Sequence, residues 1–239
     1  MIELSAPAKL TVSLRIVGVR DDGYHLIDAE MMSLGLADRL VLTDGDGLDI
    51  DGPFRPGPEV MNAGDNLVTA ALALVGERRH VALTKNIPAG AGLGGGSSDA
   101  AAILRWAGFE DLEQAANLGA DVAFCLRGGR ARVRGIGEIV SDLPFEERTF
   151  TLLTPPIHAS TPVVYRAWDS MGGPVGDNGN DLEPAALVAY PQLAEARDAL
   201  WELSGVRPRL AGSGSTWFVD GAYPSARTIV TTSIRSQAV

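Results

Sequence analysis

The chain has 239 residues, enough for one large domain or two smaller ones. Hydrophobic residues make up 46% of it and charged residues 21%, which predicts a folded globular protein and excludes a disordered one. The formal net charge of −10 argues against binding to nucleic acid, and no apolar run is long enough to span a membrane.

The N-terminus and the single cysteine indicate where the protein acts. The opening stretch "MIELSAPAKLTV" carries an acid at Glu3 and lacks the basic region of a signal peptide, so we expect a cytoplasmic protein. Cys125 is the only cysteine, which excludes an intrachain disulfide, and its apolar neighbours predict a buried thiol. His80 and His158 have no partner at ligand spacing and are interpreted as ordinary residues, so any metal ligands stay unknown.

The first half of the chain predicts mainly strands. The strand candidates are rich in β-branched and aliphatic residues, and "DGDG" between two of them predicts a tight hairpin turn. Asp65 and Asn66 are N-cap candidates for one helix. In chain order we expect strands at 8–19, 39–43, 48–51 and 81–85, with the helix at 65–77 between the last two.

The second half mixes helices and strands without a regular alternation, which favours an α+β fold over a doubly wound sheet. Helices are predicted at 99–108, 110–119 and 192–205, and strands at 122–126, 130–135, 148–155 and on both sides of the glycine turn in 208–221.

One glycine-rich stretch stands out, "NIPAGAGLGGGSSDAAAIL" at residues 86–104. A linker is one interpretation, but an apolar strand enters this stretch and a helix leaves it. Glycines let a backbone approach a phosphate closely, and a helix N-terminus offers free N–H groups and a favourable dipole. No lysine follows the glycines, which argues against a Walker A loop, and the acid expected of a Rossmann fold is missing from the next strand.

This loop resembles the phosphate loop of the superfamily of galactokinase, homoserine kinase, mevalonate kinase and phosphomevalonate kinase. The triple glycine before Ser97 and Ser98 is most similar to members that act on a cytidine-diphosphate-linked sugar alcohol. The resemblance runs from about residue 5 to residue 220, through "APAKLTVSL", "RDDGYH", "DNLV", "LGADVAFCLRGGRARVRGIGE", "STPVVYRAWD", "NDLE" and "AGSGSTWF", in the expected order.

The resemblance implies a two-domain α+β small-molecule kinase. Residues 1–147 would form a nucleotide-binding domain like ribosomal S5 domain 2, and residues 148–239 a ferredoxin-like domain that closes over the substrate. With ATP and Mg²⁺, the enzyme would phosphorylate the 2-hydroxyl of a cytidyl-linked methylerythritol in the non-mevalonate isoprenoid pathway. A kinase of mevalonate, homoserine or a sugar, and a non-catalytic nucleotide-binding relative, remain alternatives. We expect a monomer or weak homodimer without nucleic-acid or membrane partners.

The same resemblance assigns two catalytic residues. Asp121 matches a catalytic aspartate that could accept the hydroxyl proton, and Lys9 a lysine that could orient this carboxylate and stabilise the transferring group. From the residues alone, Asp121 could equally cap a turn and Lys9 could be a solvated surface side chain.

Substrate and nucleotide residues follow from the resemblance in the same way. Tyr24 and His25 look like a cytidine-binding pair, Tyr165 would cover the other face of the base, and Thr11 stands where the family commonly has asparagine. Both tyrosines could instead be a turn residue and a core residue, and Asn66 only an N-cap. The residues expected to bind the nucleotide are Asn66, Leu67, Pro88, Ala89, Gly90, Ala91, Gly92, Leu93, Gly94, Gly95, Gly96, Ser97 and Ser98.

Overall fold

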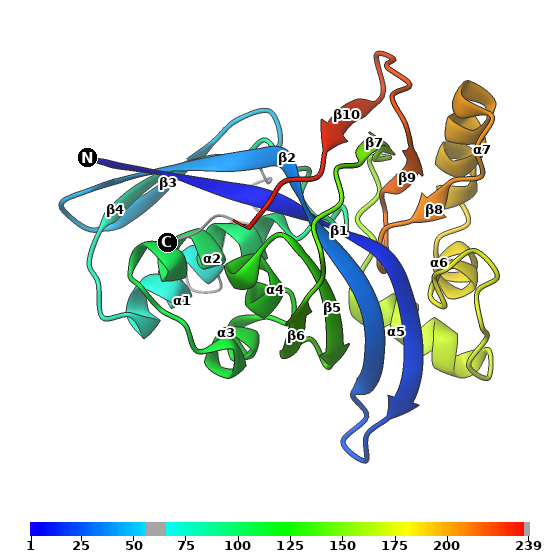
Figure 1. The fold of residues 1–239 in the computed structure, drawn as a ribbon, viewed down its shortest axis with the longest axis horizontal. Coiled ribbons are helices and arrows are strands. Elements are labelled where there is room, and N and C mark those ends of the chain that lie inside the picture. The colour runs from blue at the N-terminus through cyan, green and yellow to red at the C-terminus, as the bar shows by residue number, and fades with distance from the viewer. Residues whose placement is uncertain (56–65, 237–239) are drawn as a thin grey trace.

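A computed structural model describes residues 1–55 and 66–236 of the chain. Asp65, one of the two N-cap candidates, lies outside these residues. The expected α+β class is confirmed: the structure has two separate sheets with helices packed beside them, and the sheets lie next to each other (Figure 1). Within the described ranges, no helix is both long and apolar enough to cross a membrane.

The first sheet is built on a long antiparallel hairpin of β1 (Ile2–Val19) and β2 (His25–Thr43). Its other strands are β3 (Gly47–Asp51), β4 (His80–Thr84), β5 (Arg130–Gly135) and β6 (Ile139–Asp142), in the order β3-β4-β2-β5-β6 with β1 paired to β2. The predicted hairpin between β2 and β3 is wrong. Both strands exist, but β4 lies between them and pairs with each. The "DGDG" turn therefore connects two strands that are not neighbours in the sheet.

Four helices pack on one face of this sheet: α1 (Leu67–Leu74), α2 (Gly95–Trp106), α3 (Leu112–Leu118) and α4 (Val122–Arg127) (Figure 1). Helix α2 is central and contacts α1, α4 and β1. The run "VAFCL", predicted as a strand, is helix α4. A short continuous apolar run does not separate a strand from a buried helix, and here every residue from Val122 to Leu126 is buried.

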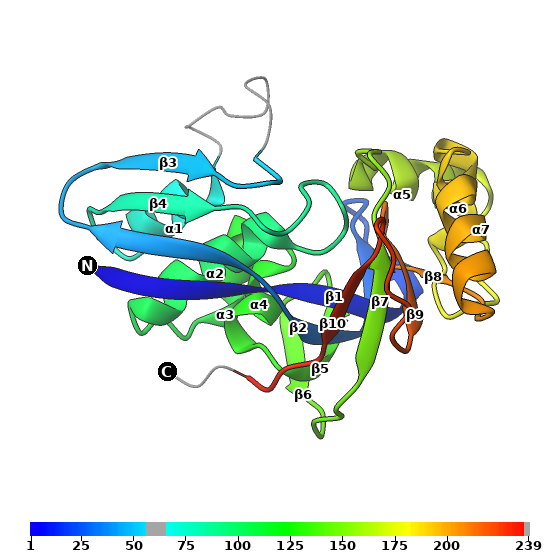
Figure 2. The ribbon, with the colours of Figure 1, turned by 90° about the horizontal axis from the view of Figure 1, so that it is seen from above.

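The second sheet contains β7 (Thr149–Leu153), β8 (Arg209–Leu210), β9 (Trp217–Asp220) and β10 (Ile229–Thr232) in the order β10-β7-β9-β8. Helices α5 (Thr161–Ser170), α6 (Glu183–Ala189) and α7 (Leu193–Ser204) lie between β7 and β8 in the chain, with α6 and α7 on the outer side (Figure 2). This strand order, fourth-first-third-second, is that of a ferredoxin-like β-α-β-β-α-β unit. However, residues 221–228 form an irregular connection where such a unit has its second helix.

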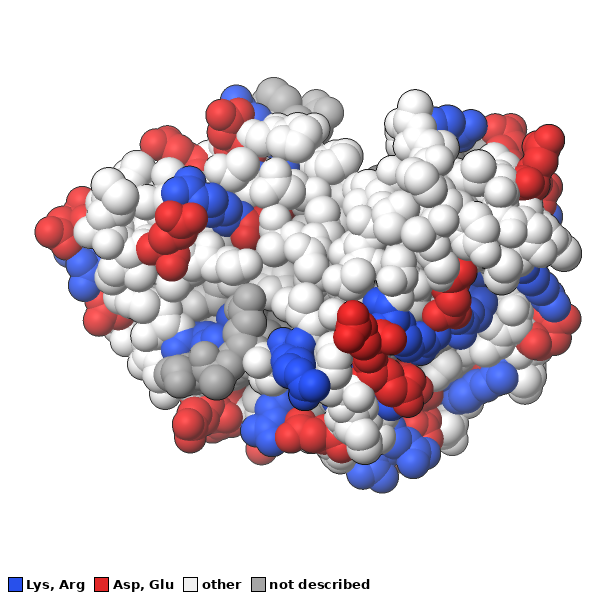
Figure 3. Space-filling model, turned by 45° about the horizontal axis from the view of Figure 1, so that its top comes forward, with Lys and Arg blue, Asp and Glu red and all other residues white. Residues whose placement is uncertain are grey.

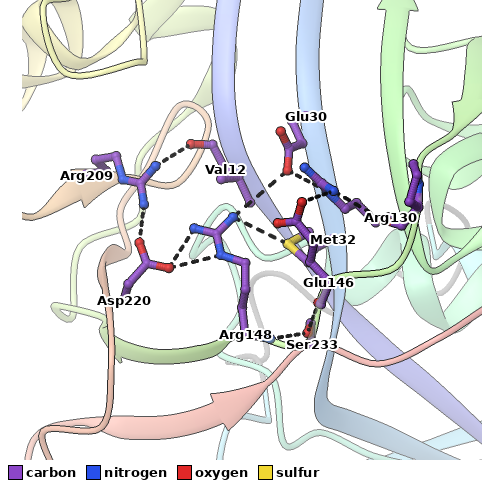
Figure 4. A network of polar contacts seen from close by, with 10 residues as sticks. Val12, Glu30, Met32, Arg130, Glu146, Arg148, Arg209, Asp220 and Ser233 are labelled. Carbon is purple, nitrogen blue, oxygen red and sulfur yellow. Dashed lines mark hydrogen bonds and ion pairs between the residues drawn. The ribbon is translucent and has the colours of Figure 1, made fainter.

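A chain of alternating charges joins the two sheets (Figure 4). Arg148, just before β7, pairs with Asp220 of β9 at 2.6 Å and lies 4.0 Å from Glu30 of β2. Asp220 also binds Arg209, and Glu30 binds Arg130 of β5. On the face of the molecule shown in Figure 3, acidic and basic side chains likewise lie side by side.

Candidate active site

The glycine loop takes a backbone path that other residues could not follow. Gly90, Gly92 and Gly94 have φ of +66°, +76° and +67°, in the left-handed region. A Cβ on Gly92 would lie 2.6 Å from the carbonyl oxygen of Ala211, so the loop packs directly on the connection between β8 and β9. Gly94 is the N-cap of α2 and makes no side-chain cap, which leaves the helix N-terminus to a ligand.

A first pocket of about 360 Å³ opens over this loop. Asn66 belongs to it and also caps α1, because its Oδ1 accepts a hydrogen bond from Val68 N at 2.9 Å. The interpretation of Asn66 as an N-cap is therefore confirmed, and its role toward a nucleotide stays a prediction. The lining includes most residues expected to bind the nucleotide, namely Asn66, Leu67, Pro88, Ala89, Gly90, Ala91, Gly92, Gly94, Gly95, Gly96 and Ser97.

Leu93 and Ser98 are not brought to the lining of this pocket. Leu93 is buried, and its carbonyl oxygen accepts a hydrogen bond from Lys9 N at 2.9 Å. The Ser98 hydroxyl donates to the carbonyl oxygen of Pro7 at 2.5 Å and is buried beside Cys125. Both residues fasten the loop and α2 to β1 instead of facing the pocket.

A buried charged triad of Lys85, Asp38 and Asp99, which sequence reasoning missed, lies beside the glycine loop. Lys85 donates from Nζ to Asp38 and, at 2.6 Å, to Oδ2 of Asp99. Asp38 Oδ1 also accepts the backbone N–H groups of Asn86 and Ile87, at 2.5 and 2.8 Å. Asp38 thus holds the chain where it leaves β4 for the loop. Lys85 and Asp99 also line the first pocket.

The two predicted catalytic residues are in contact. Lys9 Nζ lies 3.0 Å from Asp121 Oδ2 and donates to Thr11 Oγ1 at 3.1 Å. Lys9 is buried on β1, whereas the Asp121 side chain, at the N-terminus of α4, is 32% exposed. The lysine is therefore not a solvated surface residue, and Asp121 makes no side-chain cap to its helix.

A second pocket of about 680 Å³ contains this pair. Gly212 and Ser213, from the glycine turn between β8 and β9, form part of its wall, and Gly92 lines both pockets. The two pockets therefore meet at the glycine loop. The lining includes every residue predicted for catalysis or for the substrate: Lys9, Thr11, Tyr24, His25, Asp121 and Tyr165.

The aromatic residues of the second pocket come from both halves of the chain. Tyr24 is exposed at the end of the β1–β2 hairpin, with the Arg20 guanidinium 5.9 Å from its ring centroid. The His25 ring lies 4.7 Å from the ring of Tyr165, which belongs to α5. Burial, together with the nearby charge of Asp121, raises the pKa of Tyr165 to about 12, so its hydroxyl stays neutral.

Sequence reasoning also missed Arg166 and Asp169 of α5, which line the second pocket beside Tyr165. A signal was present for Asp169, because it follows Tyr165 by four residues and residues at i and i+4 of a helix lie on the same face. Asp38 offered no comparable signal. Nothing in "LADRL" indicates that β2 pairs with β4 and so brings Asp38 next to Lys85.

Comparison with known proteins agrees with this geometry. Residues 66–129 match the family described as GHMP kinases N terminal domain. The 4-diphosphocytidyl-2-C-methyl-D-erythritol kinase of Paracoccus denitrificans is 36% identical, over 93% of this chain and 87% of that protein. A crystal structure of 4-(cytidine 5'-diphospho)-2C-methyl-D-erythritol kinase covers 97% of this chain, and 99% of its own, with a TM-score of 0.76 and 31% identity. Homoserine kinase from Cytophaga hutchinsonii shares the fold, with a TM-score of 0.62, 19% identity and coverage of 99% and 95% of the two chains.

The fold and the glycine loop define an ATP-dependent small-molecule kinase of the GHMP class. Within that class, the chain belongs to the family of 4-diphosphocytidyl-2-C-methyl-D-erythritol kinases.

Proposed function

We propose that this protein transfers the γ-phosphoryl group of ATP to the 2-hydroxyl of 4-diphosphocytidyl-2-C-methyl-D-erythritol, in the non-mevalonate route to isoprenoid precursors. The observation that carries the proposal is the contact of Lys9 with Asp121 in the second pocket, beside the loop that also walls the first pocket. This arrangement supports a nucleotide on one side of Gly92 and an alcohol acceptor on the other.

The proposed catalytic roles follow from the charges of this pair. Asp121 accepts the proton of the attacking hydroxyl, because its carboxylate is partly exposed to the second pocket. Lys9 keeps that carboxylate oriented through the 3.0 Å contact and adds positive charge near the transferring phosphoryl group. Thr11 fixes the lysine by accepting its hydrogen bond.

The nucleotide is proposed to lie with its phosphates on the glycine loop. Backbone N–H groups at the uncapped start of α2 attract the phosphates, and the glycines leave room for them. Asn66, Leu67 and the loop residues that line the first pocket contact the rest of the nucleotide. Leu93 and Ser98 contribute by holding the loop to β1.

Mg²⁺ is proposed as the cation that accompanies ATP. Among the described residues no cluster of three or more acidic, histidine or cysteine side chains could hold a metal ion. This fits Mg²⁺, which proteins commonly bind through substrate phosphates with one or two oxygen donors of their own. The Ser97 hydroxyl, in the first turn of α2 and in the lining of the first pocket, is a suitable donor. The ion would neutralise charge on the phosphates.

The cytidyl group is proposed to bind between the β1–β2 hairpin and α5. Tyr24 offers an exposed aromatic face for stacking, His25 a ring nitrogen for the edge of the base, and Tyr165 a partly buried ring for the other face of the base. Arg166, which is exposed and lines the same pocket, offers positive charge to the diphosphate.

The decisive experiment compares acceptors with the purified protein, ATP and Mg²⁺. We expect turnover of 4-diphosphocytidyl-2-C-methyl-D-erythritol to exceed that of mevalonate or homoserine by at least about a hundredfold, because the latter have no base to stack. Equal rates would favour a related small-molecule kinase, and absent turnover a non-catalytic nucleotide-binding protein.

The proposal also includes the domain boundary, the oligomeric state, the partners and the location of the protein. We place the domain boundary between residues 147 and 148, which is supported by the separation of β1–β6 from β7–β10 into two sheets. A monomer or weak homodimer is supported by the fact that one chain supplies both pockets. The interspersed charges of Figure 3 and the net charge of −10 speak against a nucleic-acid partner. The use of ATP and a single cysteine suit the cytoplasm.

A further inference from the structure

The second pocket contains a contact between a histidine and an aspartate that the proposed reaction does not use. His25, at the start of β2, directs Nε2 to Oδ1 of Asp169, on the last turn of α5, at 2.8 Å. The imidazole is 10% exposed, and the rings of Tyr165 and Trp168 enclose it at 4.7 and 5.4 Å. Trp168 is itself fixed, because its Nε1 donates to the carbonyl oxygen of Pro174 at 2.9 Å.

The contact with Asp169 determines where the imidazole carries its hydrogen. An ionised carboxylate only accepts hydrogen bonds, so Nε2 must donate and must be the protonated nitrogen of a neutral ring. Nδ1 is then an acceptor. Within the described chain Nδ1 has no hydrogen bond, so it is the ring nitrogen available to a ligand in the second pocket.

We propose that Asp169 is a positioning residue that holds His25 in the Nε2–H tautomer and thereby makes the second pocket select cytosine over uracil. An acceptor at Nδ1 matches the exocyclic amino group of cytosine, whereas uracil presents a carbonyl oxygen at the same place. A pocket that aligns two acceptors rejects the wrong base more strongly than a missing contact would. This inference rests on the proposed function, since it needs a cytidyl group in this pocket.

The contact joins two residues that come from different halves of the chain. His25 belongs to the hairpin of the first sheet, and Asp169 to a helix that follows the first strand of the second sheet. Neighbouring acids do not replace Asp169, because Asp22 is engaged with Arg20 at 2.6 Å and with the backbone N–H of Tyr24.

The test measures inhibition constants of CDP and UDP against the cytidyl-linked substrate at pH 8.5, where an ordinary imidazole is neutral. The wild-type protein should bind CDP at least about tenfold more tightly than UDP. In Asp169→Ala we expect CDP binding to weaken by about tenfold with UDP changed less than about threefold, and kcat within about threefold of the wild type. Asp198→Ala, the same change at an exposed acid on α7, is the control and should retain the wild-type ratio.

The ring nitrogens report on the mechanism directly. In a ¹⁵N-labelled protein, the His25 signals, identified by their loss in His25→Gln, should show a protonated Nε2 and a bare Nδ1. Asp169→Ala and Asp169→Asn should both give a mixture of tautomers, since an amide can either accept from Nε2–H or donate to a bare Nε2. The asparagine variant keeps the shape of the side chain and covers the case in which the alanine variant does not fold.

Three results would overturn the inference. They are equal affinities of the wild type for CDP and UDP, an equal loss of both ligands in Asp169→Ala, and unchanged tautomers in both variants. The proposed function stands or falls separately, because it depends on turnover of the cytidyl-linked substrate by the wild-type protein.

Discussion

Lys85 carries one positive charge and donates to two buried carboxylates, so it can neutralise the charge of only one of them. Asp38 accepts hydrogen bonds from Lys85 and from two backbone N–H groups. Asp99 accepts one from Lys85, while its other oxygen, Oδ1, is buried and has no partner among the described residues. Burial therefore raises the pKa of Asp99 to about 7, although Lys85 acts in the opposite direction. Near neutral pH, Asp99 is the member of the triad that exchanges a proton.

The raised pKa of Asp99 predicts a specific dependence of stability on pH. Between about pH 4 and pH 7 the folded protein keeps a proton that the unfolded chain has released, so the free energy of unfolding falls as the pH rises through this window. Asp99→Asn has no such proton. From pH 5 to pH 8, the wild type should lose on the order of 2 kcal/mol more than this variant in urea unfolding. Asp198→Asn is the control, and parallel pH profiles of wild type and Asp99→Asn would contradict the prediction.

Asp121→Asn tests the proposed base. The amide keeps the size of the side chain but cannot take the hydroxyl proton, so kcat should fall by about 10²- to 10⁴-fold. ATP affinity, measured by calorimetry, should change by less than about threefold, because Asp121 lies outside the lining of the first pocket. Asp142→Asn, at an exposed acid paired with Arg127, should retain activity. A near-normal kcat in Asp121→Asn would remove the assigned role.

The glycine loop, as an element, depends on both backbone conformation and space. Gly92 and Gly76 share the left-handed region, with φ of +76° and +70°, but only Gly92 lies against other backbone atoms. Gly76→Ala should therefore cost only the strain of φ, about 1 kcal/mol in unfolding. Gly92→Ala should cost more and weaken ATP binding by about tenfold or more, because the loop must move away from Ala211. Similar losses in the two variants would show that the close packing is unimportant.

The elements also show how far a single sequence can be interpreted. Strands with alternating burial, such as β4, and helices with clear ends, such as α7 before Gly205, were predicted close to their positions. Helix α4 was missed because a five-residue apolar run carries no period that distinguishes a helix from a strand. The pairing of β2 with β4 was missed because it depends on contacts distant in the chain, which local turn chemistry does not encode.

At the scale of the molecule, the segment after β10 connects the two sheets. Ser233 accepts a hydrogen bond from Arg148 N at 2.8 Å and donates to the carbonyl oxygen of Glu146 at 2.7 Å. The next residue, Ile234, donates its N–H to Ser33 of β2 at 2.9 Å. The seam between the sheets is therefore closed by backbone and hydroxyl groups beside the charged chain of Figure 4.

Ser233→Ala tests this closure. Removal of a buried hydroxyl leaves the N–H of Arg148 and the carbonyl of Glu146 without their partner, and we expect a loss of about 1–3 kcal/mol in the free energy of unfolding. Ser225→Ala removes an exposed hydroxyl from the connection before β10 and should change stability by less than about 0.5 kcal/mol. Equal stability of the two variants would show that the hydroxyl does not matter at the seam.

Part of the candidate site could be predicted from the sequence, and part of it could be found only in the structure. The glycine loop, Lys9 and Asp121 stand in motifs that a sequence displays, and the structure places them around two adjoining pockets. The contact of Asp169 with His25 and that of Asp38 with Lys85 became visible only once helices and strands from distant parts of the chain were packed together. Motifs therefore predict the groups that we propose to meet the ligands, whereas the groups that we propose to orient them depend on the assembled fold.

Gly92 is part of the wall of both pockets, and this shared peptide has a thermodynamic consequence. We expect whichever ligand binds first to restrain this peptide, so that the second ligand would meet a site whose conformational entropy is already reduced. Donor and acceptor should accordingly strengthen each other's binding by the same factor, irrespective of the order of addition.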